Sequence, residues 1–231
     1  MKKIIVISDN IQLVESFKEI LKKLQIQNIF HYFSTNRISN EIEPINVREE
    51  ALKILKYDLL ISLHCQQLIP FEIHSKIKCF NFHPGYNPVN RGWYPQTFCI
   101  LNGGKYGATI HEIDNTIDGG KIIGQIETVI EPYYTSKEAY EINRIAELQL
   151  IEKNIELILN DTYFSKSLEE KGNYNSKNDF HELLELDLSK KTTLGEAIDL
   201  LRSLSFEGYD NAYYKTLDGS KIFVDIKLRK E

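Results

Sequence analysis

The sequence lacks long apolar runs and an excess of positive charge. Its N-terminal apolar run, residues 4–7, ends at Ser8-Asp9-Asn10 and is too short for a signal peptide or a membrane span. Lysine and arginine number 28 against 33 aspartates and glutamates, which gives a net charge of −5. A chain with this balance does not attract polyanions over its whole surface. We therefore expect a cytoplasmic protein with neither a nucleic-acid polymer nor a membrane as its partner.

Cysteines are few, and a glycine-rich nucleotide fingerprint is missing. The three cysteines, Cys65, Cys79 and Cys99, form no CxxC pair and lie in apolar surroundings. This pattern indicates reduced thiols rather than disulfides or a structural zinc site. The first expected strand-to-helix turn, at Ser8-Asp9-Asn10, has no GxGxxG pattern, which argues against NAD as a cofactor.

The remaining composition is that of a globular protein, since 42% of the 231 residues are hydrophobic and 26% are charged. β-Branched runs alternate with helical apolar spacing along the first 160 residues. The expected strands are residues 3–8, 28–33, 57–63, 78–82, 107–113 and 121–130. The expected helices are residues 11–24, 47–55, 95–101 and 136–159. Such alternation predicts an α/β fold with a mostly parallel sheet and flanking helices.

The C-terminal part is expected to be a separate small unit. Residues 165–178 have almost no apolar content and indicate a connector. A helix is expected at residues 193–204, and Asp218-Gly219 between two alternating runs, 211–216 and 220–228, predicts a β-hairpin. We therefore predict a main domain at residues 1–160, a connector at 161–190 and a helix-hairpin unit at 191–231. That unit is too small to be stable unless it packs on the main domain or on a second subunit.

The most informative segment is Asn81-Phe82-His83-Pro84-Gly85, followed 35 residues after His83 by Asp118-Gly119-Gly120. Residues two apart in a strand point to the same side, so Asn81 and His83 project together. They do so at the strand's carboxyl end, where ligands bind in open parallel sheets. The glycines after Asp118 allow a turn that brings this carboxylate beside the imidazole.

Residues 59–125 contain NxHP, a loop with Trp and Pro, a hydrophobic strand and then IDxGG. This combination resembles the formyltransferase family that uses N10-formyltetrahydrofolate. The resemblance implies the family's Rossmann-like fold, N10-formyltetrahydrofolate as co-substrate, no metal and a catalytic set of Asn81, His83 and Asp118. Asn81 and a protonated His83 would donate hydrogen bonds to the oxyanion, while Asp118 would hold the imidazolium and take up the amine proton.

The other histidines are spaced unlike metal ligands. We interpret them as structural or surface residues: His31, His64, His74, His111 and His181.

The loop at residues 83–96 resembles the variant found in N-formyltransferases that act on nucleotide-linked amino sugars. The resemblance implies a dTDP-linked amino deoxysugar as the acceptor, either dTDP-4-amino-4,6-dideoxyglucose or a 3-amino analogue. The product would serve surface polysaccharide synthesis, such as lipopolysaccharide O-antigen, and the enzyme is expected to be a homodimer.

Two sets of binding residues are expected around the catalytic set. The predicted folate-binding residues are Leu63, Cys65, Leu68, Ile113, Asp114 and Thr116. The predicted sugar-nucleotide residues are Asn10, Gln66, Asn87, Arg91, Trp93, Tyr94, Phe206, Tyr209, Asn211 and Tyr213. Within the second set, Arg91 either fixes its loop or contacts a phosphate, and Trp93 either anchors the loop or forms a wall for the sugar. An aromatic of the C-terminal unit would stack on the base.

Several alternatives remain open. A purine-type transformylase would not need the terminal hairpin, a methionyl-tRNA formyltransferase would carry a larger and more basic C-terminal domain, and a formyltetrahydrofolate hydrolase would carry an N-terminal regulatory domain. A non-catalytic folate or nucleotide-sugar binding module is a different class, and the intact catalytic set argues against it. A glycosyltransferase-like domain would be expected to carry an Asp-x-Asp metal site, which is absent.

Overall fold

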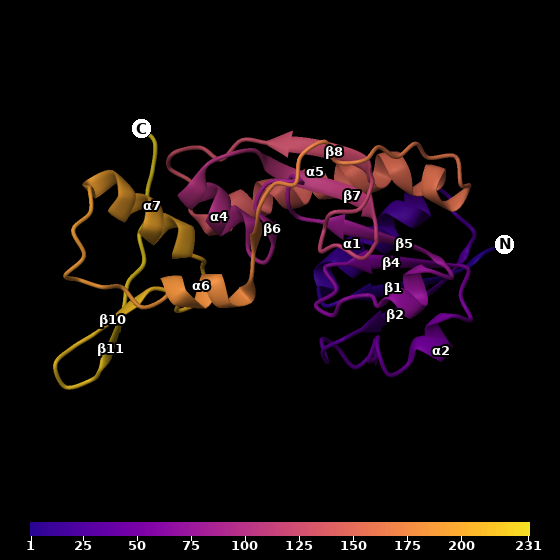
Figure 1. Cartoon of the computed structure of the whole chain (residues 1–231), viewed down its shortest axis with the longest axis horizontal. Helices are drawn as coiled ribbons and strands as arrows, with labels where there is room; N and C mark the ends of the chain where they lie inside the picture. Colours follow the sequence, from indigo (N-terminus) through magenta and orange to yellow (C-terminus); the bar gives the residue numbers. More distant parts are fainter.

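A seven-stranded mixed sheet forms the centre of the larger unit (Figure 1). The computed structural model describes all 231 residues. The strands follow the order β3-β2-β1-β4-β5-β7-β8. The first five are parallel, while β7 runs antiparallel to both β5 and β8. Their bounds are β1 (Lys3–Ser8), β2 (Ile29–Ser34), β3 (Glu43–Pro44), β4 (Leu59–Leu63), β5 (Lys78–His83), β7 (Tyr106–Glu112) and β8 (Ile122–Thr128).

Helices cover both faces of this sheet because the central strands are apolar on both sides. Ile4 and Val6 of β1 face a core shared with α1 (Ile11–Lys23) and α5 (Ser136–Leu159). Their neighbours Ile5 and Ile7 face a second core, shared with the short helices α2 (Ala51–Ile54) and α3 (Phe71–His74). All four side chains are fully buried, and each contributes roughly 1.5–3 kcal/mol relative to an exposed position. None of the helices combines the length and the apolarity that crossing a membrane requires.

The predicted α/β class with a mostly parallel sheet is confirmed, and the differences are local. The helix expected at residues 47–55 is only one turn, α2, because residues 46–50 form turns capped by Asn46. Helix α3 was not expected, since a four-residue helix is too short to show a periodic pattern. The two hairpin strands are shorter than predicted: β10 is Tyr213–Lys215 and β11 is Lys221–Phe223.

The C-terminal unit packs on α4 (Pro95–Asn102) and lies at one end of the molecule (Figure 1). Its residues 191–231 form α7 (Leu194–Leu204) and the β10–β11 hairpin, and α6 (Lys177–Leu183) of the predicted connector packs with them. Phe98 of α4, Phe180 of α6 and Leu204 of α7 share one small apolar core. The buried Arg202 adds a polar anchor, since its Nη1 donates to the Tyr134 carbonyl at 2.9 Å. The unit is therefore fastened to the larger one by apolar and polar contacts.

The segment at 161–190, predicted as a connector, joins the two units and is held against the first. Strand β9 (Tyr174–Asn175) pairs with β6 (Arg91–Gly92), which follows the loop after β5. The fully buried Asn90 organises this contact, because its Oδ1 accepts hydrogen bonds from Asn173 (2.7 Å) and Asn175 (3.3 Å). Helix α6 also begins within this segment, where Ser176 and Asp179 form a capping box. This helix was not predicted from the sequence, because the segment before it is almost entirely polar.

Candidate active site

Three polar side chains meet where β5 ends, as the sequence predicted. Asn81 Nδ2 donates to Asp118 Oδ1 at 3.0 Å, and His83 Nδ1 lies 3.8 Å from Asp118 Oδ2. Ser62 Oγ, on the neighbouring β4, donates to Asn81 Oδ1 at 2.9 Å and so turns the amide nitrogen of Asn81 towards the carboxylate. Asn81 and His83 lie two residues apart in β5 and so point to the same side, and the turn after β7 brings the Asp118 carboxylate to them.

The turn that carries Asp118 is held from several sides. Asp118 itself adopts a left-handed conformation, with φ of +48°, a strained state that clusters at functional sites. Gly120 has no room for a side chain, because a Cβ there would overlap the Glu112 carbonyl. Asn87 Nδ2 donates to the Asp118 carbonyl at 2.6 Å, and Arg91 Nη1 donates to the Ile117 carbonyl at 2.8 Å. The position of the carboxylate is therefore set by the loop after β5.

Burial and charge set the protonation of the site. Burial lowers the pKa of the His83 imidazole below its usual value, and the Asp118 charge offsets this only in part. Burial alone would raise the pKa of the Asp118 carboxyl, but His83, His111 and the Gly92 N–H outweigh it and hold this pKa well below its usual range. At neutral pH we therefore describe His83 as neutral and Asp118 as ionised.

This description changes the roles that the resemblance implied. A resting imidazolium at His83 is disfavoured by the burial of this side chain, of which 6% is exposed. A carboxylate with a strongly lowered pKa is also a poor proton acceptor. The neutral His83 is the better base of the two, and Asp118 is suited to orienting it.

Two further histidines lie near the site, although we expected structural or surface positions for them. His111, on β7, is paired with Asn81 in the sheet, and its Nε2 accepts from Asn81 Nδ2 at 3.2 Å. His64 follows β4 and contacts Glu147 of α5 at 2.8 Å. The β5–β7 register, once known, would have placed His111 beside Asn81. His64 and Glu147, in contrast, meet only through the packing of α5.

The predicted folate-binding residues lie at the adjoining edge of the sheet. Cys65 and Ile113 pack on the same apolar core. The Leu63 side chain is fully buried, so only its backbone can reach a ligand, whereas 65% of Leu68 is exposed. Asp114 Oδ1 accepts from the N–H of Thr116 at 2.7 Å, which shapes the turn before Asp118.

The loop residues predicted for the sugar nucleotide are of two kinds: residues that hold the loop and the Asp118 turn in place, and half-buried aromatics. Asn87 is buried and braces Asp118, while Arg91 bridges the Ile117 and Lys171 carbonyls and so fixes its loop. Tyr94 stacks on Phe180 of α6, with ring centroids 3.9 Å apart. Trp93 lies beside Tyr94 and is half-buried.

An aromatic cluster links the C-terminal unit to the first strand-to-helix turn. Asn10 caps α1 and donates through Nδ2 to the Tyr140 hydroxyl at 3.1 Å. Tyr140, which the sequence analysis did not single out, packs on Phe206 with ring centroids 5.7 Å apart, and Phe206 packs on Tyr209. Predicted residues from distant parts of the chain therefore meet here.

The remaining predicted sugar-nucleotide residues have other partners. Asn211 Nδ2 donates to the Leu204 carbonyl, and Tyr213 pairs with Phe223 within the hairpin. Gln66 is exposed after β4, where its N–H donates to Asp9 Oδ2 at 2.8 Å. Asn211 and Tyr213 thus hold the C-terminal unit together.

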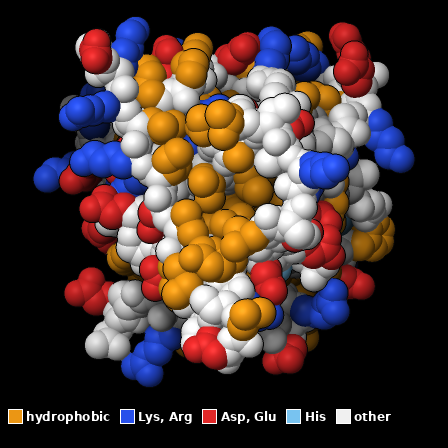
Figure 2. Space-filling view, turned by 90° about the vertical axis from the view of Figure 1, so that its left-hand side faces the viewer, with side chains coloured by type: hydrophobic (Ala, Val, Ile, Leu, Met, Phe, Trp, Pro, Cys, Tyr) orange, Lys and Arg blue, Asp and Glu red, His pale blue; other side chains and the backbone are white.

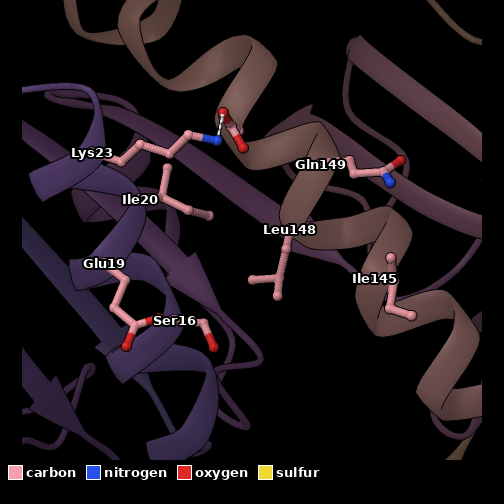
Figure 3. Close-up of a pocket in the computed structure, with 8 residues that line it drawn as sticks. Ser16, Glu19, Ile20, Lys23, Ile145, Leu148 and Gln149 are labelled. Carbon is pink, nitrogen blue, oxygen red and sulfur yellow. Dashed lines mark hydrogen bonds and ion pairs between the residues drawn. The ribbon is translucent and has the colours of Figure 1, made fainter.

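A groove of about 330 Å³ lies between α1 and α5 (Figure 3). It is lined by residues of these two helices alone, and the Lys23–Glu152 ion pair lies at its wall. None of the predicted site residues lines it, so this groove is separate from the polar cluster at the end of β5.

Comparisons with known proteins show which family and which proteins the chain is similar to. A formyl transferase family model matches residues 2–155, and a model of the N-formyltransferase dimerization C-terminal domain matches residues 179–230. The chain is 40% identical, over 187 residues and 80% of each protein, to a dTDP-4-amino-4,6-dideoxyglucose formyltransferase of Mycobacterium tuberculosis.

Solved structures are similar over the whole chain. A sugar N-formyltransferase from Shewanella sp. has a TM-score of 0.95 at 35% identity, and a 4-N formyltransferase from Francisella tularensis has a TM-score of 0.91 at 36% identity. Each match covers 100% of this chain and 99% of the other. An N-formyltransferase from Helicobacter canadensis, solved with folinic acid and dTDP-3-aminofucose, has a TM-score of 0.73 at 25% identity and covers 96% and 86% of the two chains. The chain belongs to the formyl transferase family.

Proposed function

We propose that the protein transfers a formyl group from N10-formyltetrahydrofolate to the amine of dTDP-4-amino-4,6-dideoxyglucose. The observation that carries this proposal is the meeting of Asn81, His83 and Asp118 at the end of β5. The 40% identity to an enzyme named for this sugar supports the acceptor. As the sequence analysis expected, we assign the reaction to the cytoplasm and its product to a surface polysaccharide such as O-antigen.

The residues around the catalytic set fit a folate. Leu68, 65% exposed, and Ile117, 38% exposed next to Asp118, leave apolar surface uncovered at this edge. Backbone groups of the loop after β4 and of the turn at residues 113–116 supply polar partners beside it. Apolar walls with a few polar groups are typical of such ligand sites. The co-substrate supplies a formyl carbonyl whose oxygen becomes negative when an amine attacks the carbon.

The protein's own groups then divide the work. Ser62 already turns the amide nitrogen of Asn81 towards the site. This nitrogen exchanges its hydrogen bond to His111 for a hydrogen bond to the developing oxyanion. Neutral His83 takes the proton of the attacking amine and returns it to the departing folate nitrogen. Asp118 stays ionised, orients Asn81 and stabilises the transient imidazolium of His83.

We also propose that the C-terminal unit forms a homodimer. Seven of the 18 exposed large hydrophobic side chains lie in residues 179–231: Leu188, Leu194, Ile198, Tyr209, Leu217, Ile222 and Phe223. On this side of the molecule, hydrophobic side chains form a band flanked by charged ones (Figure 2). Apolar patches of this kind mark interfaces, and the match to a dimerization domain points to a second copy as the occupant.

The proposed activity is tested by product formation across acceptors. We expect the wild type to release tetrahydrofolate fastest with dTDP-4-amino-4,6-dideoxyglucose, compared with its 3-amino analogue, UDP-linked amino sugars and glycinamide ribonucleotide. His83→Asn and Asp118→Asn should each lower kcat by about a hundredfold or more, with little change in sugar-nucleotide KM. His181→Asn, at an exposed histidine of α6, is the matched control. Near-normal turnover in either site variant would refute the catalytic assignment.

The protonation of His83 is tested by NMR titration of its imidazole, assigned from the signals lost in His83→Asn. Because burial lowers its pKa, the ring should be mostly neutral at pH 6.5 and should protonate only at lower pH. A ring that is mostly charged at pH 6.5 would favour the imidazolium that the resemblance implied.

Base recognition is tested by alanine variants of the C-terminal aromatics. Stacking on a base is worth about 1–3 kcal/mol, so Phe206→Ala and Tyr209→Ala should raise the sugar-nucleotide KM by about one to two decades. The folate KM should stay within about twofold. Tyr213→Ala serves as the control, because Tyr213 packs inside the hairpin. If neither Phe206 nor Tyr209 affects nucleotide binding, the base is held elsewhere.

The dimer is tested by light scattering on interface variants. Ile198→Asp and Ile222→Asp place a charge on side chains that are 40% and 41% exposed on α7 and β11, so both should convert a wild-type dimer into a monomer at micromolar concentration. Ile145→Asp, on a 60% exposed position of α5, should leave the dimer intact. A monomeric wild type, or unchanged dimers in both variants, would contradict the proposal.

A further inference from the structure

A second buried carboxyl group lies within electrostatic range of His83, and the reaction described above does not use it. Glu147 lies on α5 with 2% of its surface exposed. Its Oε1 accepts a hydrogen bond from His64 Nε2 at 2.8 Å. Its Oε2 is buried and has no hydrogen-bond partner. Half of this carboxylate is therefore both dehydrated and unpaired.

A half-paired buried carboxylate at position 147 lowers the stability of the fold relative to an apolar side chain at the same position. The buried side chains that follow Glu147 on α5 include Leu150, Ile151 and Ile155, all in the main core. A buried carboxylate with an unpaired oxygen is less favourable than an apolar side chain of similar volume. The packing of α5 alone does not account for Glu147.

The position of the pair relative to His83 supplies a reason. Leu63 of β4 is paired with Phe82 of β5, and the residues that follow them directly, His64 and His83, both stand at the carboxyl ends of these neighbouring strands. One helical turn before Glu147, Asn143 Nδ2 donates to the carbonyl of Pro84 at 3.0 Å. The Nε2 atom of His83 is itself buried without a partner. The same face of α5 therefore closes the site around this imidazole.

We propose that Glu147 and His64 are positioning residues for His83. The Glu147 carboxylate, held by His64, stabilises the positive charge that His83 acquires when it takes the amine proton. This rests on the proposed formyl transfer. The proton moves from the amine to His83 and then to the folate nitrogen as the carbon–nitrogen bond breaks, so Glu147 neither gives nor takes a proton in this step.

The charges around His83 allow the effects of Glu147 and His64 on its pKa to be distinguished. Four ionisable groups face this ring: Asp118 from the turn after β7, His111 from β7, His64 after β4 and Glu147 from α5. Asp118 and Glu147 raise the pKa of His83, whereas His111 and His64 lower it. Removing Glu147 and removing His64 should therefore move this pKa in opposite directions.

The experiment compares Glu147→Gln with His64→Gln in the full-length protein. Gln at 147 keeps the volume and can still accept from His64, while Gln at 64 can still donate to Glu147. In Glu147→Gln the NMR pKa of His83 should fall, because a negative charge near the imidazolium is removed, and kcat should fall by about threefold or more, because His83 becomes a weaker base. Both Michaelis constants should stay within about twofold. In His64→Gln the pKa of His83 should rise.

Glu152→Gln is the matched control, since Glu152 lies on the solvent side of α5 and pairs with Lys23. It should change neither the pKa of His83 nor kcat. A merely structural pair would lower the melting temperature in both site variants without moving the pKa of His83 in opposite directions, and that result would overturn the inference. If Glu147→Gln does not fold, an unchanged or lowered pKa in His64→Gln overturns it as well. Because the titration needs no turnover, it is separate from a failure of the proposed reaction.

Discussion

The carboxylate of Asp118 is a charge with only 14% of its side chain exposed, and the surrounding elements are arranged to satisfy it. Asn81 of β5 donates to one oxygen at 3.0 Å and the Gly92 N–H of β6 donates to the other at 3.1 Å. A buried charge without such donors would be strongly destabilising. The carboxylate therefore stays in place only when β5, the loop after it and the turn between β7 and β8 are all folded. The same constraint leaves His83 between this carboxylate and α5, which makes its protonation the quantity on which the proposed chemistry depends.

The sequence predicted the sheet and the meeting of Asn81 with His83 for the same reason. Apolar runs buried on both faces mark the central strands, and residues two apart in β5 point to one side, so Asn81 and His83 could be placed together from local pattern alone. The partners that α5 contributes, Tyr140 and Glu147, could not be found in this way. Their contacts with Asn10 and His64 join residues more than 80 positions apart, and they depend on where a long helix crosses the end of the sheet. The one-turn helix α3 leaves no periodic signal.

The C-terminal unit connects the site with the outer surface. Phe206 packs on Tyr140 of α5, which also accepts from Asn10 at the end of β1. The hairpin strands follow within 20 residues and expose Ile222 and Phe223. Association of two copies through this unit would steady the aromatic cluster that we assign to the base. Sugar-nucleotide binding and dimer formation are thus expected to depend on the same small apolar core around Phe98, Phe180 and Leu204.

A crystal structure of the protein with dTDP-4-amino-4,6-dideoxyglucose and folinic acid tests the location of the reaction most directly. The account predicts that the folate lies along residues 63–68 and 113–116, and that the sugar amine lies beside His83. The amine nitrogen should lie about 4 Å from the folate N10. In the reaction this nitrogen approaches the formyl carbon, which is bonded to N10, to roughly 3–3.5 Å before the new bond forms. Ligands bound in the α1–α5 groove, or an amine far from Asn81 and His83, would contradict it.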